Sequence, residues 1–345
     1  MPEEGRKRPL IVPIFIPYQG CPHRCIYCQQ EKITDQVAGR LNPSDITETL
    51  NKAIRSPRFK QTENPEVAFY GGTFTSLPEE RMIRLLEAVG PYIRQGFFGS
   101  IRVSTRPDAL DADKLTLIRD LNVNTVELGA QSMDDGVLGL TRRGHSAADT
   151  IDSVRLLKEN GFKVGIQLMP GLPGDTHKTF LKTVDAVIRL CPDMVRIYPT
   201  VVIRGTELEK LYRAGHYRPL SLMEAVRLCV QSCTQLEENG IPVIRLGLMS
   251  SPSLLEEGQI IAGPWHQAFG FLVRSEMLHQ KIAPYLPDKD DIEKIRLRAP
   301  RREIPLVVGY KNRGLHSIEE RTGAKVMGVI PDDSIPTGQI RVERV

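Results

Sequence analysis

The sequence has little cysteine: six residues in 345, too few for a chain held together by disulfide bonds. It also has no uninterrupted run of about 18 apolar residues, which a membrane-spanning helix would require. The first ten residues, MPEEGRKRPL, lack the apolar stretch of a secretory signal peptide. We therefore expect a cytoplasmic protein without a membrane partner, in which the cysteines remain thiols.

The sequence also has little excess of one charge over the other, because its 46 basic residues nearly balance its 42 acidic ones and the formal net charge is only +4. A charge this small neither establishes nor excludes a nucleic-acid partner. Low-complexity tracts and internal repeats beyond a strand–helix unit are absent, which disfavours disordered and solenoid chains. With 41% hydrophobic residues, the chain can bury one large core or two smaller ones.

Short β-rich segments alternate with helical patterns along the first 250 residues. EVAFYGG precedes RMIRLLEAVGPYI, for example, and KVGIQLMPG precedes TFLKTVDAVIRL. Six such pairs can be traced, and IPVIRLGL is a possible seventh strand. Strands separated by helices favour right-handed crossovers and a parallel sheet. We therefore predict an α/β fold, specifically a partial (βα)6-type TIM barrel of parallel strands.

The alternation ends near residue 250. SPSLLEEGQIIAGPWHQAFG has a loop-like composition, and DIEKIRLRAP, REIPLVVGY, LHSIEERTGAKV and GQIRVERV favour a small α+β extension. We therefore predict a barrel over residues 1–250 and an extension over residues 251–345. The loop-like segment holds the only tryptophan, Trp265, next to His266. Either a covering role over a reactive site or packing between domains would suit Trp265.

Three of the six cysteines, Cys21, Cys25 and Cys28, lie within eight positions directly after the first predicted strand. In βα barrels the loops that follow the strands carry the reactive groups. A structural zinc ion would need four ligands, and His23, between two of these cysteines, is poorly placed to complete a tetrahedron with them. A 4Fe-4S cluster held by only three cysteines leaves one iron open to a small molecule.

The other three cysteines follow a different pattern. Cys229 and Cys233 lie four residues apart in the amphipathic helical segment LMEAVRLCVQSCTQLEENG. Free cysteine behaves as a small hydrophobic residue, so we predict that these two and Cys191 pack in the core.

The segment CPHRCIYC resembles the signature of the radical S-adenosylmethionine (SAM) enzymes. In that family, three cysteines at this spacing bind a 4Fe-4S cluster whose open iron chelates the amino and carboxylate groups of SAM. The segment YGGTFTSLP resembles the family's glycine-rich turn, where the absence of a Cβ lets the backbone approach the methionine amine. The resemblance thus implies cluster ligands Cys21, Cys25 and Cys28, and SAM-binding residues Tyr27, Gly71, Gly72 and Thr73.

Further segments, STRPDAL, VELGAQSMDDGVLGLTRRGHSAADT, QLMPGLPGDT and RIYPTVVIRGTELEKLY, resemble one branch of that superfamily over about residues 10–215. The branch contains the Elongator catalytic subunit and oxygen-independent coproporphyrinogen III oxidase. By this resemblance Gln131, Arg143 and Gln167 contact the ribose and carboxylate of SAM. The chain departs from Elongator by its shorter cysteine spacing and by lacking an acetyl-CoA loop pattern after residue 250. It departs from the oxidase by having Ser104 in place of a glutamate.

The resemblance implies an enzyme that receives an electron from a flavodoxin or ferredoxin and cleaves SAM to a 5′-deoxyadenosyl radical. Three hypotheses about its role remain. The radical could modify RNA, such as a tRNA base, by analogy with Elongator. It could instead act on a porphyrinogen-like or other small molecule, as an oxidase or transferase. The chain could also be a non-catalytic metal-binding module, although the ordered motifs from Gly71 to Gln167 count against this third hypothesis.

Overall fold

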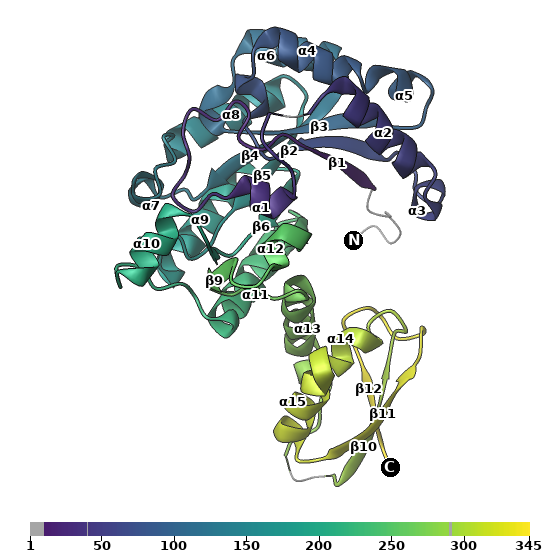
Figure 1. The fold of residues 1–345 in the computed structure, drawn as a ribbon. Helices are drawn as coiled ribbons and strands as arrows, with labels where there is room; N and C mark the ends of the chain where they lie inside the picture. Colours follow the sequence, from purple (N-terminus) through teal and green to yellow (C-terminus); the bar gives the residue numbers. More distant parts are fainter. Residues whose placement is uncertain (1–9, 40, 290–291) are drawn as a thin grey trace. The chain divides into compact units, whose positions relative to one another are not determined.

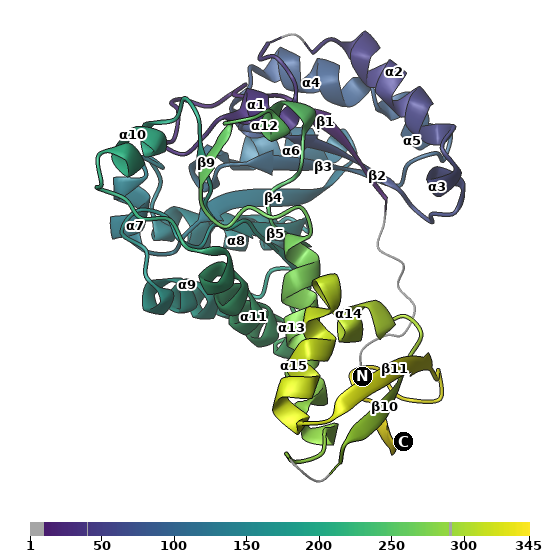
Figure 2. The ribbon, with the colours of Figure 1, turned by 60° about the horizontal axis from the view of Figure 1, so that its bottom comes forward.

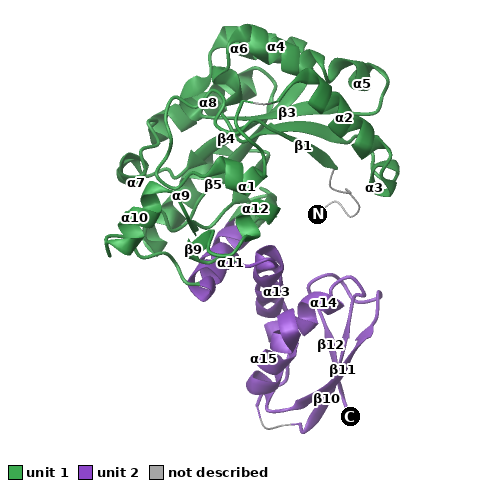
Figure 3. Ribbon diagram, in the orientation of Figure 1, with its two compact units in different colours: residues 1–221, 236–265 green, residues 222–235, 266–345 purple. Residues whose placement is uncertain are grey.

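The computed structural model describes residues 10–39, 41–289 and 292–345. The chain forms two compact units, shown in Figure 3. The first unit contains the residues up to 221 together with 236–265, and the second contains 222–235 together with 266–345. The helix α11 (Leu222–Glu238) belongs mostly to the second unit. The domain boundary drawn after residue 250 stays a prediction.

Seven parallel strands form the sheet of the first unit, in the order β1-β2-β3-β4-β5-β6-β8. Each strand of the sheet returns beside the previous one after a crossover; the short β7 (Val202–Ile203) is not part of it and pairs with β9 (Ile260–Ala262) in a separate sheet. The strands are β1 (Ile11–Phe15), β2 (Glu66–Tyr70), β3 (Ser100–Thr105), β4 (Val123–Gln131), β5 (Lys163–Leu168), β6 (Met194–Ile197) and β8 (Val243–Leu246). Figure 1 shows this sheet curving as an open barrel. The predicted α/β fold with a partial barrel is confirmed.

Helices cover the outer side of the curved sheet (Figure 1). The longer ones form because apolar residues recur at helical spacing behind an N-terminal cap. In α9, for example, Thr176 caps the helix and Phe180, Val184 and Val187 are buried. The helices of the unit are α1 (Gln30–Thr34), α2 (Pro43–Ile54), α3 (Pro57–Lys60), α4 (Glu79–Glu87), α5 (Gly90–Arg94), α6 (Ala112–Asp120), α7 (Asp135–Leu140), α8 (Ala147–Glu159), α9 (His177–Leu190), α10 (Glu207–Arg213) and α12 (Pro252–Leu255).

The alternation of side chains along the strands gives the sheet two different faces. Val67 and Phe69 of β2, like Val126 and Leu128 of β4, are fully buried in the apolar core. The intervening residues of the same strands, such as Glu127, line a cavity on the other side. The inner positions that line this cavity are Glu66, Tyr70, Arg102, Ser104, Glu127, Gly129, Gln131, Gln167 and Arg196. The fold therefore reserves one face of each strand for the core and the other for a site.

The second unit has a three-stranded sheet in the order β11-β10-β12, built from β10 (Lys294–Ala299), β11 (Lys325–Pro331) and β12 (Arg341–Arg344). The pairing of β10 is parallel with β11 and antiparallel with β12. The helices α13 (Phe269–Ile282), α14 (Ile304–Val308) and α15 (Arg313–Thr322) belong to this unit and are visible from a second side in Figure 2. Leu278, Ile295, Leu297, Val307 and Ile318 form its core. This unit provides the expected small α+β extension.

The three cysteines outside the CPHRCIYC segment differ in burial. Cys229 and Cys233 are fully buried, as predicted. The prediction for Cys191 is wrong, because this residue is exposed. It ends α9 in a left-handed conformation, one residue beyond the helix and its buried stripe. Among the residues that the structure describes, we find no helix with the length and apolar character needed to cross a membrane.

Candidate functional site

The three clustered thiols lie on the loop that joins β1 to α1. Tight turns fold this loop: the Cys21 N–H donates to the Tyr18 carbonyl over 3.1 Å, and the Cys28 N–H to the Cys25 carbonyl over 3.0 Å. All three cysteines are partly exposed and line a single cavity of 1390 Å³ on the inner side of the barrel. The loop after the first strand thus brings the thiols to the expected edge of the sheet.

The three thiols line the cavity but do not converge on a site for a single metal ion. In the described ranges, no three His, Cys, Asp or Glu side chains converge closely enough to hold a single metal ion. The thiols nevertheless interact: burial, together with the charges of Cys25 and Cys21, raises the pKa of Cys28 to about 12. Cysteines bind a 4Fe-4S cluster as thiolates, each on a different iron. Three thiols around one opening fit such a cluster.

The glycine turn after β2 lies directly against the thiol loop. A Cβ on Gly72 would stand 2.0 Å from the carbonyl oxygen of Gln19, so only glycine fits there. Gly71 has a φ of +111°, a conformation that side chains disfavour. The Thr73 N–H donates to the same Gln19 carbonyl over 2.8 Å, and the Thr73 hydroxyl lies 3.4 Å from the Cys21 sulfur. The turn therefore holds the thiol loop in place as well as lining the cavity.

Arg143 links the thiols to the end of β4. Its guanidinium donates to the Cys25 sulfur over 3.0 Å and to the Gly129 carbonyl over 2.6 Å. Burial opposes the charge, but the charges of Tyr27 and Cys25 hold the pKa of Arg143 above its usual value. Within the described residues, the Nε of Arg143 and the hydroxyl of Tyr27 are buried without a well-placed hydrogen-bond partner. These unsatisfied groups beside the thiols fit a site made for a further polar ligand.

Gln131 and Gln167 meet on the neighbouring strands β4 and β5. The Gln167 side-chain amide donates to the side-chain oxygen of Gln131 over 3.1 Å. Gln131 has a φ of 68°, which is uncommon for a residue with a side chain, and its strand carries a bulge there. Both side chains line the cavity that the thiols line. The structure thus brings together, around one cavity, all ten residues that the sequence analysis proposed for the cluster and SAM.

A buried ion cluster inside the barrel, formed by Glu66, Arg102, Glu127 and Arg196, was not foreseen. Arg102 donates to Glu66 over 3.0 Å and to Glu127 over 2.6 Å. Arg196 forms an ion pair with Glu127 at 2.8 Å. The only signal in the sequence was a charged residue at an inward position of otherwise apolar strands, as in SIRVST and NTVELG. Buried charges of this kind are tolerated because each has a partner of opposite sign.

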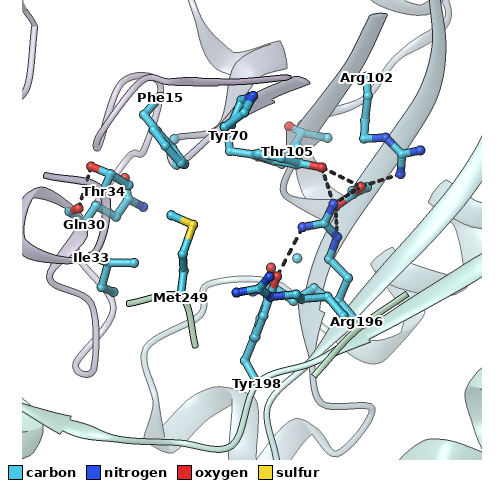
Figure 4. Close-up of a pocket in the computed structure, with 18 of the residues that line it drawn as sticks. Phe15, Gln30, Ile33, Thr34, Tyr70, Arg102, Thr105, Arg196, Tyr198 and Met249 are labelled. Atoms are coloured by element: carbon cyan, nitrogen blue, oxygen red, sulfur yellow. Dashed lines mark hydrogen bonds and ion pairs between the residues drawn. The ribbon is translucent and has the colours of Figure 1, made fainter. Parts of the chain in front are cut away.

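Two tyrosines extend the ion cluster toward the cavity, as Figure 4 shows. The Tyr70 hydroxyl donates to Glu127 over 3.0 Å, and burial together with the Glu127 charge raises the pKa of Tyr70 well above its usual value. Arg196 donates to the Tyr198 hydroxyl over 3.2 Å. Since Tyr198 accepts this bond, its own hydrogen remains available to a group in the cavity.

The opposite side of the cavity carries apolar side chains next to Gln30 and Thr34. Figure 4 shows Phe15, Ile33 and Met249 across the space from Arg196 and Tyr198. The volume of 1390 Å³ exceeds the roughly 300–1,000 Å³ of an ordinary small-molecule pocket. The cavity therefore has room for a second ligand beside SAM, between a polar wall and a wall that carries apolar side chains.

Two other residues named from the sequence lie outside this cavity lining. Trp265 packs against the apolar cluster of Val201, Ile203 and Leu254. The His266 ring makes an edge-to-face contact with Tyr310, with 4.9 Å between the ring centroids. These contacts give both residues a packing role within their own units. His23 lines the cavity and binds the Arg142 carbonyl at 2.7 Å, so it fastens the thiol loop.

Comparison with known proteins gives matches to two family models. The model described as the Radical SAM superfamily matches residues 15–187, and the Radical_SAM C-terminal domain matches residues 192–279. An uncharacterized protein of Methanocaldococcus jannaschii, MJ0486, is 30% identical over 61% of this chain and 66% of its own length. A tRNA uridine(34) acetyltransferase of Methanocaldococcus infernus is 40% identical over 36% of this chain and 24% of its own length.

A solved structure of an archaeal protein has a similar fold. It is described as the archaeal Methanocaldococcus infernus Elp3 with an N-terminal deletion, and it superposes with a TM-score of 0.60 at 24% identity. The superposition covers 79% of this chain and 63% of the other. The chain thus spans less than two thirds of the length of these relatives, and the similarity in structure concerns the fold.

Proposed function

Because the chain belongs to the radical SAM superfamily, whose members are enzymes that bind a 4Fe-4S cluster and SAM, we propose that it uses this chemistry to modify RNA. When bound, the cluster and SAM supply a 5′-deoxyadenosyl radical after the transfer of one electron. The proposal includes an external electron donor of the flavodoxin or ferredoxin type.

One observation carries the proposal: three thiols, a glycine turn, a buried arginine and two glutamines, from separate segments, line one cavity. Cys21, Cys25 and Cys28 would hold the cluster. Arg143 donates a hydrogen bond to the Cys25 sulfur and places a positive charge beside it. Gly71 and Gly72 leave backbone groups accessible to the amine of SAM.

Gln131 and Gln167 serve to orient SAM in this proposal. Their mutual hydrogen bond leaves the Gln131 amide group free to donate toward a ribose or a carboxylate. The inner residues of the strands form the wall of the cavity and would limit the access of water to the reacting atoms from that side. No side chain is required as a general acid or base, because hydrogen abstraction by a radical needs none.

Two observations support RNA as the substrate. The chain shares 40% identity with a tRNA uridine(34) acetyltransferase over 129 residues, which make up 24% of the length of that relative. The cavity also carries more cationic than anionic side chains, including Arg24, Arg58, Lys163 and Arg245, which suits an anionic substrate. A porphyrinogen-like substrate would also fit the volume, so it is an alternative outcome of the test.

The first arm of the test measures SAM cleavage. The protein is reconstituted anaerobically with iron and sulfide, reduced with dithionite and supplied with SAM, and 5′-deoxyadenosine is quantified by chromatography. We expect product from the wild type and background levels from Cys25→Ala. Cys191→Ala is the matched control, because Cys191 is an exposed thiol outside the cavity lining. Failure of the wild type to release 5′-deoxyadenosine would favour the metal-binding module.

The second arm identifies the substrate class. A tRNA transcript or a porphyrinogen is added to the reduced enzyme, and the rate of 5′-deoxyadenosine formation is compared with the rate without substrate. We expect tRNA to raise the rate and mass spectrometry of digested nucleosides to show a new mass. Stimulation by the porphyrinogen alone would overturn the RNA assignment and leave the SAM chemistry intact.

A further inference from the structure

The sheet of the second unit has one face that the helices of this unit do not bury. On β10, Ile295, Leu297 and Ala299 are fully buried in the unit's core. Since side chains alternate along a strand, Lys294, Arg296 and Arg298 point to the opposite side, where they are exposed or half-exposed. We call this side the outer face.

Strand pairing defines which other residues share the outer face. Lys325 lies opposite Lys294 on β11, while Glu343 and Arg341 lie opposite Arg296 and Arg298 on β12. Met327 and Ile330 of β11 belong to the same side. The outer face therefore consists of Lys294, Arg296, Arg298, Lys325, Met327, Ile330, Arg341 and Glu343. Five of these residues are cationic and one is anionic.

The cations of the outer face are only partly neutralised. Arg298 pairs with Glu343, and Arg341 lies 3.7 Å from Asp332. Within the described part of the chain, no ion pair is found for Lys294, Arg296 or Lys325. These three form a compact group, because Lys294 and Arg296 are two residues apart on β10 and Lys325 adjoins Lys294.

The direct opposition of Lys294 and Lys325 is unfavourable in the isolated chain. Like charges on adjacent residues of paired strands repel each other and destabilise the sheet. A bound polyanion would convert this repulsion into attraction. Arginine also binds phosphate through two parallel hydrogen bonds, and the outer face presents three arginines.

We propose that the outer face binds the phosphate backbone of RNA. This inference rests on the proposed RNA substrate and adds a binding surface outside the cavity. Lys294, Arg296 and Arg298 lie about 6.6 Å apart in succession along one strand, so they can contact successive phosphates of a strand laid along β10. Met327, with 49% of its surface exposed, and Ile330 offer apolar area against which base or sugar groups can rest. Together these residues favour RNA over an acidic protein segment.

The test compares the affinity of the full-length chain for a fluorescently labelled tRNA transcript over a series of salt concentrations. Arg296→Ala/Lys325→Ala removes two cations that have no ion pair on the outer face. Arg313→Ala/Arg321→Ala removes two exposed cations from α15, which packs against the other side of the sheet through Ile318. Circular dichroism verifies that both variants are folded.

We expect the outer-face variant to bind tRNA about tenfold more weakly, with the salt slope reduced by roughly two. The α15 variant should match the wild type, and cleavage of SAM without RNA should be unchanged in both. If the outer-face variant bound tRNA as tightly as the wild type, this inference would be overturned, but the proposal that RNA is the substrate would stand. Absence of wild-type binding would overturn both. Competition by polyglutamate as strong as by unlabelled tRNA would identify an acidic polypeptide as the partner instead.

Discussion

Two regions of the same cavity are built in opposite ways. The thiol edge, which comprises Cys21, Cys25, Cys28 and the turn Gly71–Thr73, depends on backbone turns and close approach of two loops. The buried ion cluster of Glu66, Arg102, Glu127 and Arg196 depends on side chains from four different strands. We therefore expect that adding a single Cβ to the glycine turn disrupts the thiol edge. Removing a single charged side chain should disrupt the ion cluster.

The largest effect should come from breaking the ion cluster. Glu127→Ala removes the shared partner of Arg102 and Arg196, so that Arg196 loses its carboxylate partner and Arg102 keeps only Glu66. We expect the free energy of unfolding, measured in urea, to fall by about 3–5 kcal/mol. Glu80→Ala, which breaks the exposed pair with Arg84, should cost less than about 0.5 kcal/mol. Equal losses for the two variants would contradict the difference in burial on which this comparison depends.

The free energy of unfolding should depend on pH through His145, a buried residue two positions after Arg143 whose ring nitrogen Nε2 lies 3.2 Å from the Ala130 carbonyl oxygen. Burial, together with the charges of Arg143 and Arg106, lowers the pKa of His145 to about 4, while the Ala130 carbonyl and the Asp108 charge oppose this shift. The unfolded chain therefore takes up a proton first, so stability is lost as pH falls from about 6.5 to 4. The loss should approach about 3 kcal/mol. Unfolding of wild type and His145→Gln across this range measures it, and an equally steep decline in both would exclude His145 as its source.

A single added methyl group should disable the thiol edge without breaking the ion cluster. In Gly72→Ala the Cβ must displace the Gln19 carbonyl, and with it the loop that carries Cys21. We expect the rate of 5′-deoxyadenosine formation to fall by about 100-fold, as for a reacting group misplaced by about 1 Å. Gly139→Ala is the control, because a Cβ there meets nothing within 4 Å. Comparable rates for both variants would show that the contact between the turn and the loop is dispensable.

The smallest effect should come from Tyr198, which contacts the ion cluster and lines the same cavity as the thiol edge. Tyr198→Phe removes the hydroxyl that accepts a hydrogen bond from Arg196 but leaves both carboxylates of the ion cluster in place. Stability should fall by about 1 kcal/mol. SAM cleavage in the absence of substrate should stay within about twofold of wild type. A large loss of that basal cleavage would mean that the hydroxyl belongs to the thiol edge rather than to the ion cluster.

The sequence was informative about the thiol edge because its residues are close together in the chain. Cys21, Cys25 and Cys28 follow a fixed spacing, and Gly71 and Gly72 directly follow a strand. Arg102 and Glu127, by contrast, are single charged residues in apolar strands, 25 positions apart. Their meeting depends on strand register, which spacing in the sequence does not specify. The same limit explains Cys191, whose exposure depends on where α9 ends.

The alternation of strand and helix patterns determined the parallel barrel, since a right-handed crossover leaves few other arrangements. The spacing of three cysteines determined where we predict the metal site, on the loop after the first strand. Only the tertiary structure decided that Arg143 contacts Cys25 and that Gln131 contacts Gln167. It also decided that five cations share one face of the second sheet. These contacts join residues far apart in the chain, and only the packing of the strands sets which of their side chains meet.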